Sequence, residues 1–67
     1  MREWLTIIRK QQKLSQYDMA DLTGLSQSYY AAIETGQRGK PLAVPVAKKI
    51  ARVLGFDWQR FYTDADA

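Results

Sequence analysis

The chain of 67 residues contains neither cysteine nor histidine. Without cysteine it forms no disulfide bond and no thiolate metal site, and without histidine it lacks the commonest general base and metal ligand. No apolar run approaches the roughly 20 residues that a membrane-spanning helix needs, and the opening residues 1–4 show no leader pattern. We therefore expect no metal, no cofactor and no membrane contact, and a cytoplasmic location.

Proline and glycine are also scarce, with two and four residues respectively. They divide the chain into short segments that favour helices, and no segment alternates at period two as a half-buried strand would. We predict an all-α fold, a compact bundle of about five short helices. A single domain is expected over residues 1–63, with a frayed tail at 64–67. Domains of this size bury only about 60% of their unfolded surface, which favours association.

Local signals place the ends of the helices. Ser15 and Asp18 predict a capping box at the start of the second helix, and Gly24 suits the left-handed residue that ends it. Its apolar side is assigned to Met19, Ala20 and Leu22. The expected helices cover residues 3–13, 16–23, 27–35, 44–54 and 58–62.

The third of these segments carries two adjacent tyrosines, which helical geometry must separate. At about 100° per residue, Tyr30 falls on the same side as Ile33 and Glu34, which we interpret as the inward side. A tyrosine there needs a partner for its hydroxyl or access to the surface. Tyr29 falls on the border. The outward side holds small, uncharged residues, namely Ser28, Ala31, Ala32 and Thr35.

The second and third helices, with the turn between them, resemble a helix-turn-helix unit over residues 15–35. Over roughly residues 5–54 the chain resembles the Cro/C1-type (lambda-repressor-like, XRE) DNA-binding family. The features shared in order and spacing are Arg9, Leu14-Ser15-Gln16, Ala20, Gly24-Leu25-Ser26, Ile33-Glu34 and Gly36. The resemblance implies a five-helix fold whose third helix lies in the major groove of DNA.

The resemblance also implies which side chains read bases. Gln27 would form two hydrogen bonds to an adenine and be braced by Gln16, while Ser28 would bond a base edge. Ala31 or Ala32 would meet a thymine methyl group. The alternative is that Gln27 and Ser28 are ordinary residues of a first helical turn.

Other residues are expected to support these contacts. The side chains assigned to phosphate contact are Gln16, Tyr29, Thr35, Arg38 and Lys40, although Arg38 and Lys40 also suit solvated loop positions. Arg9 and Glu34 would form a buried ion pair that joins the first and third helices. The formal net charge of +3 is compatible with a polyanionic partner.

Two functions remain open from the sequence. The first is a sequence-specific DNA-binding transcriptional regulator, a small repressor of phage or mobile-element type that binds a palindromic operator as a homodimer. The second is a protein-binding helix-turn-helix module, like an antitoxin or antirepressor, that meets a regulatory protein through its C-terminal aromatic helix. An enzyme is not expected, because no nucleophile stands with a base. The residues assigned to association are Val46, Val53, Trp58, Phe61 and Tyr62, of which the aromatic ones also suit a cover over the core.

Overall fold

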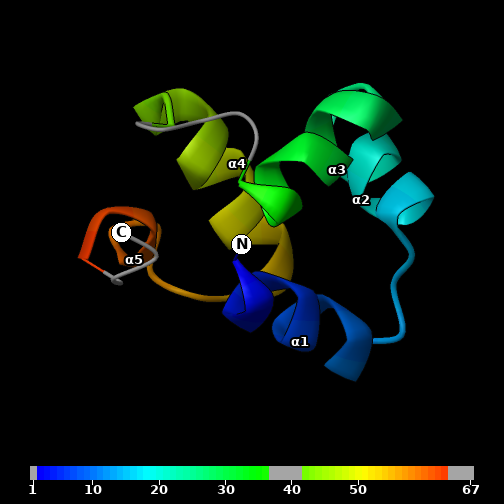
Figure 1. Ribbon diagram of the computed structural model, residues 1–67, viewed down its shortest axis with the longest axis horizontal. Coiled ribbons are helices and arrows are strands. Elements are labelled where there is room, and N and C mark those ends of the chain that lie inside the picture. The colour runs from blue at the N-terminus through cyan, green and yellow to red at the C-terminus, as the bar shows by residue number, and fades with distance from the viewer. Residues whose placement is uncertain (1, 37–41, 64–67) are drawn as a thin grey trace.

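Five helices surround one core in the computed structural model, which describes residues 2–36 and 42–63. They are α1 (Glu3–Gln11), α2 (Gln16–Thr23), α3 (Gln27–Thr35), α4 (Val44–Leu54) and α5 (Arg60–Thr63). Helix α4 passes through the middle, with α1 below it, the α2–α3 pair on one side and α5 on the other (Figure 1). The described ranges contain no strand, which confirms the all-α prediction. Within them, no helix has the length and apolar character needed to cross a membrane.

Side-chain caps and a glycine define the helix-turn-helix unit locally. The Ser15 hydroxyl accepts a hydrogen bond from the Asp18 backbone N–H at 3.0 Å, and the Asp18 carboxylate accepts one from the Ser15 N–H at 2.8 Å. The predicted capping box is therefore confirmed. Ser26 caps α3 by accepting from the Tyr29 N–H at 3.1 Å. Gly24 ends α2 with a φ of 75°, a conformation that costs glycine little.

Two helix ends differ from the expected positions by two residues. Helix α1 ends at Gln11, because Lys13 takes a φ of 60° and cannot continue a right-handed helix. Helix α5 begins at Arg60, later than the sequence indicates. The residues before it form a turn in which the Gln59 N–H donates to the Asp57 carboxylate at 3.0 Å. Both differences arise where a turn competes with the first or last helical residues.

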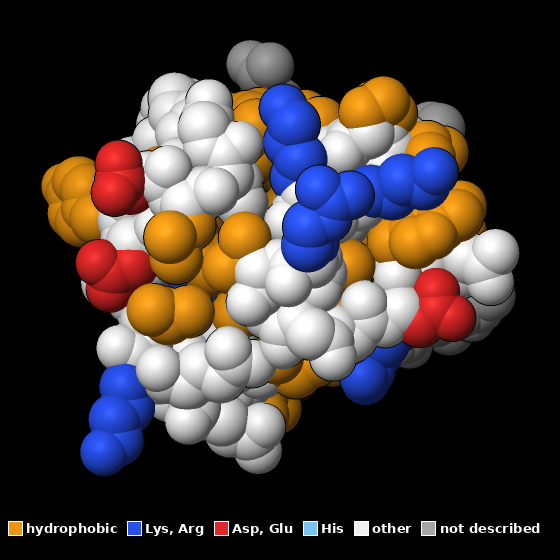
Figure 2. All heavy atoms as spheres, turned by 180° about the vertical axis from the view of Figure 1, so that it is seen from behind, with side chains coloured by type: hydrophobic (Ala, Val, Ile, Leu, Met, Phe, Trp, Pro, Cys, Tyr) orange, Lys and Arg blue, Asp and Glu red, His pale blue; other side chains and the backbone are white. Residues whose placement is uncertain are grey.

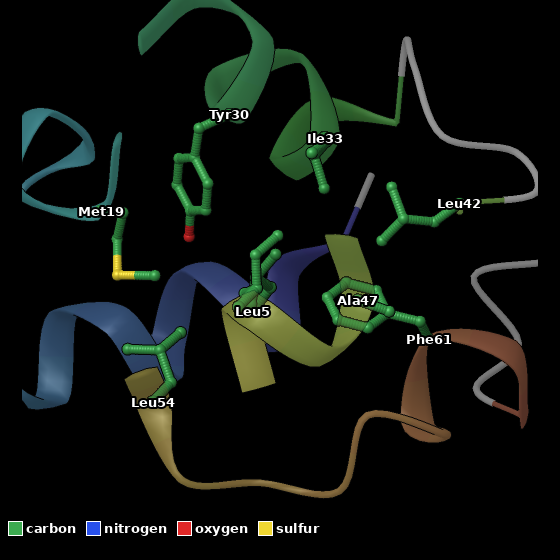
Figure 3. Close-up of a cluster of buried hydrophobic side chains, with 9 residues drawn as sticks. Leu5, Met19, Tyr30, Ile33, Leu42, Ala47, Leu54 and Phe61 are labelled. Carbon is green, nitrogen blue, oxygen red and sulfur yellow. The ribbon is translucent and has the colours of Figure 1, made fainter. Parts of the chain in front are cut away.

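The hydrophobic core lies between the five helices (Figure 3). Helix α2 packs against α3 and α4, and α1 packs against α3. Leu22, expected on the apolar side of α2, is 56% exposed, whereas Thr23 is buried and donates its hydroxyl to the Met19 carbonyl at 2.6 Å. Packing on two other helices therefore decides the rotation of α2. The core consists of Leu5, Met19, Tyr30, Ile33, Leu42, Ala47, Ile50, Leu54 and Phe61.

Tyr30 supplies the aromatic ring that fills the core beneath α3. Its ring points from α3 into the space between Met19 and Leu5, with the hydroxyl at the inner end (Figure 3). The hydroxyl is buried and has no hydrogen-bond partner among the described residues. Burial raises the pKa of the Tyr30 phenol, so it stays neutral. The expected surface access for this hydroxyl is therefore wrong, and the neighbouring Glu34 carboxylate also raises the pKa of the phenol.

Candidate nucleic-acid interface

Helix α3 has a buried side and an open side. Tyr30, Ile33 and Glu34 are each at most 2% exposed, as expected for the inward side. Tyr29 is half-buried and packs against the edge of the core, so it lies on the border between the two sides. The open side consists of Ser28 and Thr35, which are exposed, and Ala31 and Ala32, which are half-buried. This side carries no charged residue and lets the helix backbone approach another surface closely.

The Glu34 carboxylate collects hydrogen bonds from side chains of α1 and α2. Arg9 donates from Nε to Oε2 at 2.6 Å and from Nη2 to Oε1 at 3.3 Å. Thr6 and Gln16 also donate to Oε1, at 3.0 and 3.1 Å. The side chains of Arg9 and Glu34 are only 9% and 3% exposed. Helices α1 and α3 are thus joined by the buried ion pair that the family resemblance implied.

The contacts of this pair favour its ionised state. Burial alone raises the pKa of Glu34, but hydrogen bonds, with the one from Arg9 foremost, hold that pKa below its usual range. The hydrogen bond to Glu34 in turn raises the pKa of Arg9. Arg9 Nη1 also donates to the Leu14 carbonyl at 2.7 Å. One guanidinium therefore ties α1 to α3 and to the segment that leads into α2.

The two glutamines expected at the interface are in direct contact. Gln27 Nε2 donates to Gln16 Oε1 at 3.2 Å. Gln16 is the first residue of α2 and Gln27 is the first of α3. Helix starts of this kind attract phosphate groups through their unpaired backbone N–H groups. A continuous hydrogen-bonded path runs from Arg9 through Glu34 and Gln16 to Gln27. It therefore leads from the core to the N-terminal end of α3, which is its open end.

Comparison with known proteins places this arrangement in a family. The helix-turn-helix family model HTH_3 matches residues 5–61. The chain belongs to the Cro/C1-type helix-turn-helix family. This is a family of DNA-binding transcriptional regulators. A curated relative, the uncharacterized HTH-type transcriptional regulator YqaF of Bacillus subtilis (strain 168), is 42% identical over 64 residues, covering 96% of this chain and 82% of the relative. No solved structure gives a significant match.

Arg2 supports the helix-turn-helix unit in a way that sequence reasoning missed. Its side chain is 2% exposed, and Nη1 donates to the Ile33 carbonyl at 2.6 Å. The Arg2 backbone N–H donates to the Glu34 carbonyl at 2.8 Å. Its guanidinium carbon lies 5.5 Å from the centre of the Phe61 ring. Arg2 thus holds the C-terminal end of α3 against α1 and α5, where a cation also suits the helix dipole.

Of the remaining residues expected to contact DNA, Thr35 is described by the structure. Thr35 is exposed, and its hydroxyl donates to the Ala32 carbonyl at 3.1 Å, which leaves its oxygen free to accept. Arg38 and Lys40 lie outside the described residues. The phosphate contacts assigned to the segment after α3 therefore remain sequence predictions.

The residues assigned to association divide into core and surface. Phe61 is 6% exposed and packs against Trp4 and Phe56 at ring distances of 5.2 and 5.6 Å. Its assignment to a surface is corrected by this burial, since it fills the core of its own chain. Tyr62 is 40% exposed, and its hydroxyl donates to the Leu42 carbonyl. The other three, Val46, Val53 and Trp58, are half-buried at the edge of the core.

Positive charge gathers on the side that Figure 1 turns away. Figure 2 shows Lys and Arg side chains together in the upper half of this face, with Asp and Glu side chains toward its edges. Along α4, Lys48, Lys49 and Arg52 are all exposed. Lys48 Nζ lies 5.1 Å from the centre of the Trp58 ring. These α4 cations form the solvated side of the helix.

Proposed function

We propose that the protein is a sequence-specific repressor, of the kind found in phages and mobile elements, that binds a palindromic operator as a homodimer. The observation that carries this proposal is the Gln27–Gln16 hydrogen bond of 3.2 Å at the open end of α3. It holds a glutamine amide in one orientation beside a helix face that is small and uncharged. A cytoplasmic location is part of the same proposal.

The amide of Gln27 has the right groups left over to read an adenine. One of its two Nε2 hydrogens is used by Gln16. The other hydrogen and the Oε1 atom remain, which match N7 and N6–H of adenine in the major groove. Ser28, one residue further along the exposed face, would bond a neighbouring base edge. Ala31 and Ala32 would meet a thymine methyl group.

Phosphate contacts would set the register of the helix. Tyr29 lies at the border of the open face, where its ring packs on the core edge, and its hydroxyl would meet a phosphate. Gln16, Thr35, Arg38 and Lys40 complete the assigned set. Because such contacts release counterions, binding should weaken steeply as the salt concentration rises.

Association would use the apolar edge that α4 and α5 present. Val44 and Tyr62 are 42% and 40% exposed, and half-buried Val46, Val53 and Trp58 belong to the same two elements and the turn between them. A two-fold dimer through this edge would place the two recognition helices about 34 Å apart, one turn of DNA.

Selection of bound duplexes from a randomised DNA pool by the purified protein tests the proposal. We expect an enriched palindrome whose half-sites are centred about 34 Å apart. Gln27→Ala should keep the fold, since Gln27 lies outside the core, and should lose the preference at one position of each half-site. An absence of enrichment at low salt would refute the proposal.

A protein partner is the second candidate function. It is favoured by the pair of rings that Trp58 and Tyr62 form at 6.0 Å near the C-terminal end, with Tyr62 well exposed. This function would be established if Trp58→Ala abolished a complex with another protein while Gln27→Ala left both that complex and DNA binding unchanged.

A further inference from the structure

The hydrogen-bonded path from the core to the open end of α3 has a fixed direction. An ionised carboxylate only accepts hydrogen bonds, so Gln16 must turn its NH2 group toward Glu34, as the 3.1 Å contact shows. The Gln16 carbonyl oxygen then faces the other way. Gln27 meets this oxygen at 3.2 Å and must therefore donate to it. The chemistry of Glu34 thus sets the orientation of both amides.

Two features keep Glu34 in this role. Arg9 lies 2.6 Å from one carboxylate oxygen and neutralises a charge that is almost fully buried. The other oxygen, Oε1, is the one that faces Gln16 and also accepts from Thr6 at 3.0 Å. The carboxylate is therefore held on both sides and cannot rotate away from Gln16 without breaking the ion pair.

The fixed orientation limits what Gln27 can recognise. With one amide hydrogen committed to Gln16, Gln27 presents one donor and one acceptor to a base. Adenine offers the complementary pair, whereas guanine offers two acceptors, N7 and O6, and requires two donors. A freely rotating Gln27 would be able to serve either purine.

We propose that Glu34 is a positioning residue that gives Gln27 its preference for adenine over guanine, although Glu34 itself is buried beneath α3. This inference rests on the proposed base reading by Gln27. It assigns to the buried carboxylate a second role beyond joining α1 to α3. The two roles are separable because only one of them passes through Gln16.

Thr6 provides a matched control for a purely structural role. It donates to the same oxygen of Glu34 as Gln16 does, from α1, but lies off the path to Gln27. Thr6→Val should therefore weaken the support of Glu34 without changing base preference. A structural role alone predicts that Thr6→Val and Glu34→Gln affect base preference in the same way.

The experiment measures competition between two duplexes. The first is the duplex selected from the randomised pool, and the second carries guanine in place of adenine at the position that Gln27→Ala identifies. We expect Glu34→Gln and Gln16→Met each to lower the adenine-to-guanine affinity ratio by about tenfold. In Glu34→Gln the single side-chain oxygen serves Arg9, so an NH2 group faces Gln16 and the acceptor that orients Gln16 is lost. The double variant Glu34→Gln/Gln16→Met should show no further loss, because both changes act on one path. Thr6→Val should keep the ratio of the unchanged protein.

A second variant covers the case in which Glu34→Gln does not fold. Arg9→Met/Glu34→Met replaces the buried pair by apolar side chains, a change that is often neutral for stability. It removes the acceptor for Gln16 and should also lower the ratio by about tenfold. A folded Glu34 variant with an unchanged ratio would overturn the inference, as would an equal loss in Thr6→Val. A protein without any adenine preference that depends on Gln27 would instead refute the proposed function itself.

Discussion

Arg9 Nε lies 2.6 Å from Glu34 Oε2, and this buried contact joins the first helix to the helix expected to enter the groove. Removal of one partner leaves an uncompensated buried charge. Glu34→Ala should therefore lower the free energy of unfolding by about 3–5 kcal/mol, measured by chemical denaturation. The exposed carboxylate of Glu3 offers the control, since Glu3→Ala should change this value by less than about 0.5 kcal/mol. An unchanged midpoint for Glu34→Ala would show that the pair does not stabilise the fold.

Arg2 is predicted to stabilise the end of α3. Arg2→Ala removes the hydrogen bond to the Ile33 carbonyl and the contact with the Phe61 ring, and should lower the free energy of unfolding by about 1–3 kcal/mol. Thermal and chemical unfolding both measure the effect. Arg52→Ala, which removes one cation from an exposed site on α4, is the matched control and should leave the free energy of unfolding nearly unchanged. An equal loss of stability in the two variants would mean that the loss comes from the change in net charge and not from the contacts of Arg2.

The unpaired hydroxyl of Tyr30 predicts an unusual result. Tyr30→Phe removes a buried group that has no hydrogen-bond partner in the described residues, so stability should stay the same or rise by up to about 1 kcal/mol. Tyr30→Ala should instead cost about 3–5 kcal/mol, because it leaves a cavity in the core. Denaturation curves of the two variants give the comparison. A clear loss of stability in Tyr30→Phe would mean that the hydroxyl does find a partner.

Tyr29 is predicted to affect DNA affinity without affecting base preference. Tyr29→Phe keeps the ring that packs on the edge of the core and removes only the hydroxyl assigned to a phosphate. Binding to all duplexes should weaken by a similar factor, and the rank order of sequences should stay the same. Titrations with the selected duplex and with single-base variants of it measure both quantities. A changed rank order would mean that Tyr29 faces the bases.

The lowered pKa of Glu34 predicts a stability that falls in acid. Because the folded-state pKa lies below the unfolded-state value, the contribution of Glu34 is complete above about pH 5 and is lost as the pH falls through the folded-state pKa. The pKa of Asp18 is also lowered, chiefly by its hydrogen bond with the Ser15 backbone and further by its hydrogen bond with the Ser15 side chain. Asp18→Asn removes this second group. In the Asp18→Asn variant the melting temperature should still fall as the pH is lowered below about 5. A melting temperature that stays constant over this range would show that Glu34 does not make stability depend on pH.

Much of the fold followed from short-range signals in the sequence. The capping box of Ser15 and the left-handed turn at Gly24 depend on a few neighbouring residues, so they could be predicted without the rest of the chain. The division of α3 also follows from helical geometry alone. The contact between Gln16 and Gln27 had no such local signal and was expected only from the family resemblance.

The differences lie where distant segments meet. Leu22 is exposed and Thr23 buried because two neighbouring helices fix the rotation of α2. Phe61 faces the core because it packs there against the rings of Trp4 and Phe56, which belong to other segments of the chain. Arg2 was missed because a buried arginine needs carbonyl acceptors from a distant helix end, and sequence alone does not show which acceptors come near.

The separation of α3 into a held side and an open side has an evolutionary consequence. The side chains that anchor the helix, such as Ile33 and Glu34, face inward, whereas Ser28 and Thr35 are exposed. Substitutions at the exposed positions change the surface that the helix presents and leave its contacts with the core intact. After gene duplication, two copies of such a domain can diverge by single substitutions in the surface that α3 presents, and neither copy has to evolve a new core.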